Sequence, residues 1–94
     1  MSEITIDLRN INSKSDLHIL LAEQLEFPDW YGNNWDAFWD LIRDPDIVSM
    51  PDRLILLGFK DLSENLSKDA QVLQQCFLDL KKEYPSISCE IIYS

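Results

Sequence analysis

The sequence predicts a small α/β domain, in which three strands form a parallel sheet and helices pack against it. Short apolar runs typical of strands occur at the beginning, in the middle and at the end of the chain, and segments with helical apolar spacing separate them. Strands separated by helices need crossover connections, which favour parallel over antiparallel pairing. A chain of 94 residues is long enough for one core, so we expect a single domain over residues 1–94.

The first strand and the first helix are predicted from the amino-terminal part of the chain. Residues 3–8 (EITIDL) alternate between polar and apolar side chains, as in a strand that buries one face. Ser13 is the expected N-cap of a helix, with Asp16 at the spacing of a capping box. Pro28 lies beyond the end of this helix, whose apolar face comprises Leu17, Leu20, Leu21 and Leu25.

The second half of the chain supplies the other two strands and a long helix. Residues 54–57 (LILL) are apolar without alternation, which predicts a central strand that is covered on both faces. Ser67 is the expected N-cap of a helix that ends before Pro85. The apolar face of this helix comprises Leu73, Cys76, Phe77, Leu80 and Tyr84. Residues 87–93 (ISCEIIY) are expected to form the last strand.

The charge of the chain restricts the classes of partner. Seventeen acidic and eight basic residues give a formal net charge of −9 and a pI of about 4.3. Such a chain repels nucleic acid and anionic membranes and attracts basic proteins. There is no signal-peptide pattern, and no apolar run reaches the ~18 residues of a membrane span, so we expect a cytoplasmic protein. Cys76 and Cys89 lack zinc-site spacing and are expected to be buried, reduced thiols.

The segment FPDWYGNNWDAFWDLIRD, residues 27–44, is unusual because it places many aromatic side chains beside many carboxylates. Residues 32–34 are expected to form a turn, and residues 35–43 a short helix with Asn34 as its N-cap. A helical wheel gives this helix a core-facing stripe that consists of Trp35, Phe38 and Ile42.

The opposite side of this short helix carries acidic residues. Asp36 and Asp40 share an exposed face, with Trp39 at its boundary. Carboxylates four residues apart repel each other, so the arrangement does not stabilise the helix and points to a partner. A structural explanation stays open, because Asp36 can interact with the helix dipole and Asp40 can pair with Arg43. Trp and Tyr beside a charged face are nonetheless typical of the residues that dominate protein interfaces.

The stretch LHILLAEQLEFPDWYGNNWDAFWDLI resembles the corresponding part of the barstar family of intracellular ribonuclease inhibitors, in its Pro-acid-aromatic-Tyr-Gly-x-Asn-x-Asp-Ala-x-Trp-Asp pattern. The resemblance extends over nearly the whole chain, from the first strand to the late helix and strand. It implies a three-stranded parallel sheet packed by about four helices. It also implies an immunity protein that inserts acids of its second helix into the basic active site of a bacterial ribonuclease.

Carried over by position, the resemblance implies a set of partner-binding residues, Trp30, Tyr31, Asn34, Asp36, Trp39, Asp40, Asp79 and Glu83. The last two follow from aligning Phe77 in the late helix, where the family has a Glu at the position of Asp79. The chain departs from the family in two places, because Arg43 adds a cation beside the acids and the loop at residues 44–49 is longer and lacks a Gly-Trp pair. The cognate nuclease is therefore expected to differ from the target of barstar.

Other classes of function stay open on the sequence. The carboxylates of residues 36, 40, 44 and 46 could suggest a magnesium-dependent phosphoryl hydrolase, although their spacing matches no phosphate or calcium loop. His18, the one histidine, lies beside the apolar face of its helix and is expected to be a packed or surface histidine rather than a catalytic base. We expect no enzyme, metal or cofactor, and a monomer that binds its partner 1:1. A barstar-like module that binds a basic non-nuclease protein is the alternative.

Overall fold

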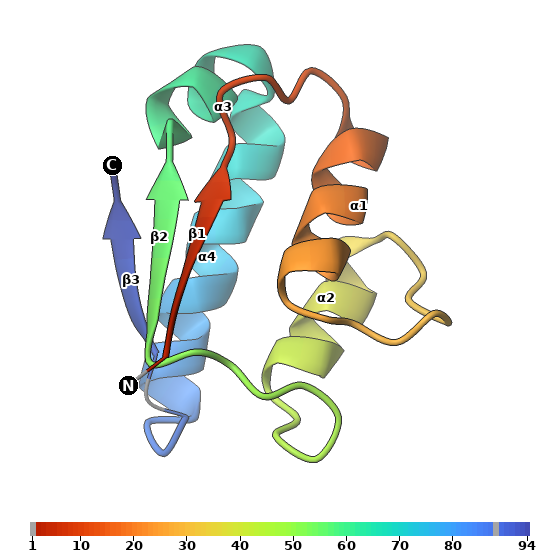
Figure 1. The fold of residues 1–94 in the computed structure, drawn as a ribbon, viewed down its shortest axis with the longest axis vertical. Helices are drawn as coiled ribbons and strands as arrows, with labels where there is room; N and C mark the ends of the chain where they lie inside the picture. The colour runs from red at the N-terminus through yellow and green to blue at the C-terminus, as the bar shows by residue number, and fades with distance from the viewer. Residues whose placement is uncertain (1, 88) are drawn as a thin grey trace.

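The computed structural model describes residues 2–87 and 89–94, which form a three-stranded parallel sheet with helices packed against it (Figure 1). The strands are β1 (Glu3–Asp7), β2 (Arg53–Leu57) and β3 (Glu90–Tyr93), in the order β1-β2-β3. Ile4 pairs with Leu54, which pairs with Ile91 on the other side. The predicted fold class and the central position of β2 are thus confirmed, while residue 88 of the expected last strand lies outside the described residues.

Four helices connect the strands, namely α1 (Lys14–Gln24), α2 (Trp35–Ile42), α3 (Phe59–Asn65) and α4 (Ser67–Glu83). The hydroxyl of Ser13 accepts a hydrogen bond from the amide of Asp16 at 3.1 Å, which begins α1. The side-chain oxygen of Asn34 accepts one from the amide of Ala37 at 2.8 Å, which begins α2. These two of the three predicted N-caps are confirmed, and each satisfies an amide that the first helical turn leaves free.

The prediction that Ser67 caps the late helix is wrong. Ser67 is the first residue of α4, and no side chain caps this helix. Leu66 alone separates α3 from α4, because its amide donates to the Leu62 carbonyl at 2.7 Å and its carbonyl accepts from the Ala70 amide at 2.9 Å. A single non-helical residue therefore joins two helices, and the sequence signal of a helix start was shifted by one position.

Aromatic rings hold α2 and α4 together in the core. The Phe38 side chain is fully buried, and its ring centroid lies 5.3 Å from Trp35, 5.8 Å from Phe27 and 5.9 Å from Phe77. All three contacts are edge-to-face, the geometry that aromatic pairs prefer. Leu41 is also buried, so the core side of α2 is centred nearer to Phe38 than the helical wheel placed it, and Trp35 is only half-buried.

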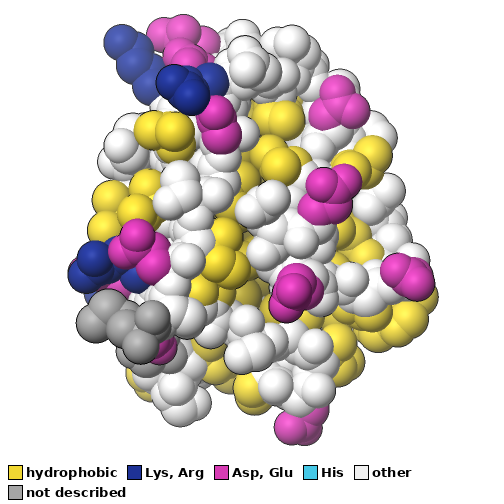
Figure 2. All heavy atoms as spheres, in the orientation of Figure 1, with side chains coloured by type: hydrophobic (Ala, Val, Ile, Leu, Met, Phe, Trp, Pro, Cys, Tyr) yellow, Lys and Arg dark blue, Asp and Glu magenta, His cyan; other side chains and the backbone are white. Residues whose placement is uncertain are grey.

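Charged side chains are unevenly distributed over the face of the molecule that Figure 2 draws. On this face Lys and Arg gather on the left, over α3 and the strands, whereas the half formed by α1, α2 and their connection shows acidic side chains alone. On this face, the charged side chains of the half formed by α1 and α2 are thus acidic. None of the helices among the described residues is long and apolar enough to cross a bilayer.

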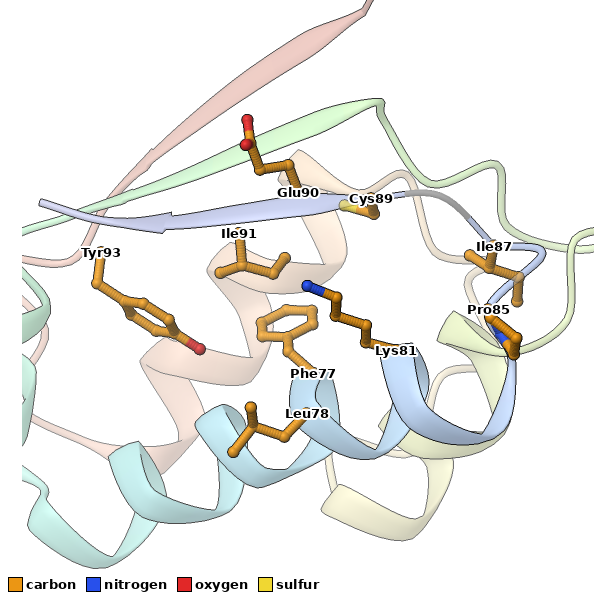
Figure 3. Close-up of a pocket in the computed structure, with 9 residues that line it drawn as sticks. All are labelled: Phe77, Leu78, Lys81, Pro85, Ile87, Cys89, Glu90, Ile91 and Tyr93. Atoms are coloured by element: carbon orange, nitrogen blue, oxygen red, sulfur yellow. The ribbon is translucent and has the colours of Figure 1, made fainter.

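The sheet is covered on one face, not on both as predicted for β2. Leu54 and Leu56 are fully buried, while Ile55 and Leu57 between them are half-buried. The helices pack on the face of Leu54, and Figure 3 shows Glu90 pointing away from α4 while Ile91 and Tyr93 point toward it. The outer face carries an ion-paired row in which the Arg53 guanidinium bonds Glu90 at 2.9 Å and Glu3 at 3.3 Å. A continuous apolar run cannot distinguish this arrangement from a doubly covered strand.

Candidate functional site

Four of the predicted partner-binding residues line one groove between α2 and α4. The groove has a volume of about 330 Å³. Its walls come from both helices, with Trp35, Asp36 and Trp39 on α2 and with Val72, Gln75, Cys76, Asp79 and Glu83 on α4. The structure therefore brings together side chains that lie more than forty residues apart in the sequence.

Three carboxylates give this groove its negative charge. Asp36 and Glu83 are exposed, and neither takes part in a side-chain hydrogen bond or ion pair among residues 2–87 and 89–94. Asp79 is half-buried and accepts a hydrogen bond from the side-chain amide of Gln75, one turn earlier on α4, at 2.8 Å. A carboxylate held in this way is ordered in the free protein, so less freedom is lost when it binds a cation.

Asp40 lines a second hollow next to this groove, of about 420 Å³, together with Arg43, Asp44 and Tyr84. One oxygen of Asp40 accepts a hydrogen bond from Nη2 of Arg43 at 2.8 Å. The ion pair that the sequence left as a structural explanation for Asp40 is thus present. Its partners are 66% and 37% exposed, so water screens it and it contributes little to stability.

Arg43 is held by two aromatic residues as well as by Asp40. Its Nη1 donates to the Tyr84 hydroxyl at 2.9 Å, and its guanidinium carbon lies 5.6 Å from the Trp39 ring and 5.9 Å from the Tyr84 ring. The bond to Asp40, followed by the bond to Tyr84, raises the pKa of Arg43 above its ordinary value. Sequence reasoning had assigned Tyr84 only to the apolar face of a helix, and its position 41 residues after Arg43 gave no signal of this contact.

The remaining predicted residues lie on the connection into α2, and the structure separates them by exposure. Trp30 is 67% exposed, which leaves its ring available to a partner. Tyr31 is only 9% exposed, and its hydroxyl lies 2.6 Å from Nδ1 of His18 and donates to the Asn34 carbonyl at 3.4 Å. The side chain of Asn34 is exposed but engaged as the N-cap. Tyr31 and Asn34 therefore fix the start of the acidic helix.

His18 is fully buried beneath this connection. Its ring lies 4.5 Å from that of Trp35, and its Nε2 is buried without a hydrogen-bond partner among the described residues. The tautomer protonated at Nδ1 satisfies Tyr31, because the Tyr31 hydroxyl can then accept from His18 and donate to the Asn34 carbonyl. Of the two predicted alternatives, a packed or a surface histidine, the structure shows the packed one, and His18 thus supports the loop below the acidic surface.

Acidification is expected to destabilise the protein through His18. Burial, followed by the charge of Lys14, lowers the pKa of His18 below its ordinary 6.5, and Asp69 raises it only in part. Below pH 6.5 the unfolded chain binds a proton that the folded chain excludes, so the free energy of unfolding falls with pH, by at most about 1.4 kcal/mol per unit. Urea unfolding at about pH 8 and pH 5.5 measures this loss.

The matched variant for this measurement is His18→Gln, whose amide can still bond the Tyr31 hydroxyl. Its free energy of unfolding should vary less between the two pH values than that of the unchanged protein. Equal pH dependence in both proteins would assign the titration to another group.

Other chemistry finds little support in the described residues. They contain no group of three or more His, Cys, Asp or Glu side chains that could hold a metal ion. Both cysteines are free, Cys76 is buried and Cys89 is half-buried. Burial and the nearby charge of Asp79 raise the pKa of the Cys76 thiol to about 11, which makes it a poor nucleophile at neutral pH.

A family model and a named relative agree in what this chain is similar to. The family model described as "Barstar (barnase inhibitor)" matches residues 1–91. A protein of Bacillus subtilis (strain 168) that carries the name "Putative ribonuclease inhibitor YrdF" is 35% identical over 91 residues. That match covers 93% of this chain and 98% of YrdF, so the similarity includes α2, α4 and the groove between them.

Proposed function

The chain belongs to the barstar family, and from that premise we propose that it inhibits a ribonuclease by placing the carboxylates of α2 in the enzyme's basic active site. The observation that carries this proposal is the groove in which Asp36 and Trp39 of α2 meet Asp79 and Glu83 of α4, with Asp40 beside it. One surface thereby presents up to five acidic and aromatic side chains to a partner.

The physical basis of the inhibition is substitution for phosphate. A ribonuclease holds the phosphates of RNA with Arg, Lys and His side chains, which bind carboxylates in the same geometry. Carboxylates carried by a helix stay in place when the enzyme's cations approach, so the inhibitor occupies the site and excludes RNA. None of the described residues that line the groove is a histidine, and the nearby His18 is fully buried. Inhibition by occupation needs no histidine, because it requires no proton transfer.

The aromatic residues have two roles in this proposal. Trp30 and Trp39 contact the enzyme around the acids and exclude water, which strengthens the charged contacts. Tyr31 and Asn34, whose polar atoms are engaged within the protein, position α2 and contribute little contact area of their own. We therefore retain all eight residues in the proposed surface, but divide them into contacting and positioning residues.

The biological setting proposed for this inhibitor is that of an immunity protein. Free ribonuclease damages RNA in the cytoplasm, so protection has to act there, and the two free thiols are compatible with a reducing compartment. A helix face inserted into a single active site also implies a 1:1 complex.

The test of this function is titration of a ribonuclease encoded next to this gene, with RNA cleavage as the readout. Cleavage should fall linearly and reach zero at one equivalent, and light scattering of the mixture should give the mass of one inhibitor plus one enzyme. Tight binding of a basic protein that leaves RNA cleavage intact would favour the non-nuclease alternative.

Association with the enzyme is expected to depend strongly on salt. A net charge of −9 attracts a basic enzyme at long range, and salt screens that attraction within about 8–10 Å. Stopped-flow association rates should fall by roughly tenfold or more between 50 and 500 mM NaCl. Rates that stay constant over this range would contradict electrostatic steering.

A further inference from the structure

Arg43 places a fixed positive charge within the acidic surface. Its guanidinium lies 2.8 Å from Asp40, the acid that sequence and family place at the centre of inhibition. Any protein that covers Asp40 therefore covers Arg43 as well. A cation in this place lowers the affinity for any enzyme that presents a positive charge beside it. Such a cation benefits the inhibitor when it distinguishes between enzymes.

The guanidinium is also prevented from turning away. Asp40 binds Nη2, the Tyr84 hydroxyl binds Nη1, and the rings of Trp39 and Tyr84 lie edge-to-face at 6.0 Å beside it. An unrestrained arginine could swing into solvent when a cation approaches, at the cost of little more than a rotamer change. The loss of two hydrogen bonds and two ring contacts makes that movement unfavourable here.

The free N–H donors of Arg43 determine which hydrogen-bond acceptors a partner has to supply. A guanidinium has five N–H groups, of which Asp40 and Tyr84 engage one each. The side chain is 37% exposed in the free protein, so water can solvate the remaining donors. A partner that removes this water has to replace it with acceptors, because a buried charged donor without a partner is costly.

We propose that Arg43, held by Tyr84 and Trp39, determines which ribonuclease this protein inhibits. It selects an enzyme that presents a hydrogen-bond acceptor, such as a carboxylate or a backbone carbonyl, beside the cation that binds Asp40. It rejects an enzyme that presents cations alone at this place. This inference rests on the proposed function, and it names the chemistry that the target must show at one defined position.

The experiment compares Arg43→Gln with Arg53→Gln, using barnase, the enzyme that the family description names, as the probe. Both variants change the net charge from −9 to −10. Arg53 also pairs with two acids, Glu3 and Glu90, but lies on the outer face of the sheet. Arg43→Gln should bind barnase at least about tenfold more tightly than the unchanged protein, whereas Arg53→Gln should stay within about twofold.

Tyr84→Phe tests the restraint separately, because it keeps the ring and removes the hydroxyl that binds Nη1. It should also gain affinity for barnase, but less than Arg43→Gln, since the charge remains and only its freedom increases. Urea midpoints of all variants show whether each is folded under the conditions of the binding assay.

The outcomes separate this inference from the proposed function. If Arg43→Gln gains no more affinity for barnase than Arg53→Gln does, Arg43 is not a specificity determinant. This holds whether or not the unchanged protein binds barnase measurably. If Asp40→Ala then still weakens inhibition of the cognate ribonuclease, the proposed function stands without it. If Asp40→Ala has no effect on any ribonuclease, the acidic surface itself has been assigned wrongly.

Discussion

Asp40→Ala is expected to weaken inhibition of the cognate ribonuclease by roughly 30-fold to several thousand-fold while the protein stays folded. Truncating one side of a desolvated charge cluster leaves the cations of the enzyme buried and unpaired. This typically costs about 2–5 kcal/mol of binding free energy, a range to which the barnase–barstar complex itself contributed. Stability should change little, because the pair with Arg43 is exposed and removal of Asp40 relieves repulsion from Asp36 one turn earlier.

The matched control for Asp40→Ala is Glu64→Ala, which removes the same charge from an exposed position on α3, outside both hollows. Inhibition constants measure binding, and urea midpoints measure folding. The two variants should have the same small effect on association through the net charge, and only Asp40→Ala should speed dissociation. If Asp40→Ala inhibits as well as Glu64→Ala, Asp40 does not contribute to inhibition and is only a solvated helix residue paired with Arg43.

Much of the fold could be predicted because its signals are local. The alternation in residues 3–8, the N-caps Ser13 and Asn34, and the proline after α4 each act over a few positions of the chain. The uncovered sheet face could not be predicted from the apolar run in β2, since it depends on the placement of helices that are distant in sequence. The Glu3–Arg53–Glu90 row that marks this face likewise joins three separate strands.

In the candidate site, too, local features could be predicted from the sequence and contacts between distant segments could not. A helical wheel was sufficient to place Asp36 and Asp40 on an exposed face, because α2 is a regular helix with a buried opposite side. The approach of Asp79 and Glu83 followed from family resemblance and not from their spacing, as they belong to another helix. Neither the helical wheel nor the family resemblance could predict the contact between Arg43 and Tyr84. The family pattern does not contain this contact, and no periodic pattern spans the two residues.

Phe38→Ala is expected to give the largest loss of stability of any variant considered, about 3–5 kcal/mol. The side chain is fully buried, and three aromatic rings from α2, α4 and the preceding connection surround it within 5.9 Å. Rigid rings cannot close the space that the alanine leaves, so a cavity adds to the lost burial. A domain of this size is stable by only about 5–14 kcal/mol, so the variant should unfold at a much lower urea concentration.

Leu78→Ala is the control for this change, because Leu78 lies on α4 but is 55% exposed, and its truncation should shift stability by no more than about 0.5 kcal/mol. Inhibition distinguishes the loss of Phe38 from the loss of Asp40. Phe38 is fully buried, so inhibition by Phe38→Ala should decline only as the folded fraction declines. Because the ribonuclease binds only the folded form and draws the equilibrium toward it, an excess of the variant should still bring RNA cleavage to zero. A Phe38→Ala protein with an unchanged urea midpoint would mean that the aromatic cluster does not join α2 to α4, and the geometry of the groove would then need another support.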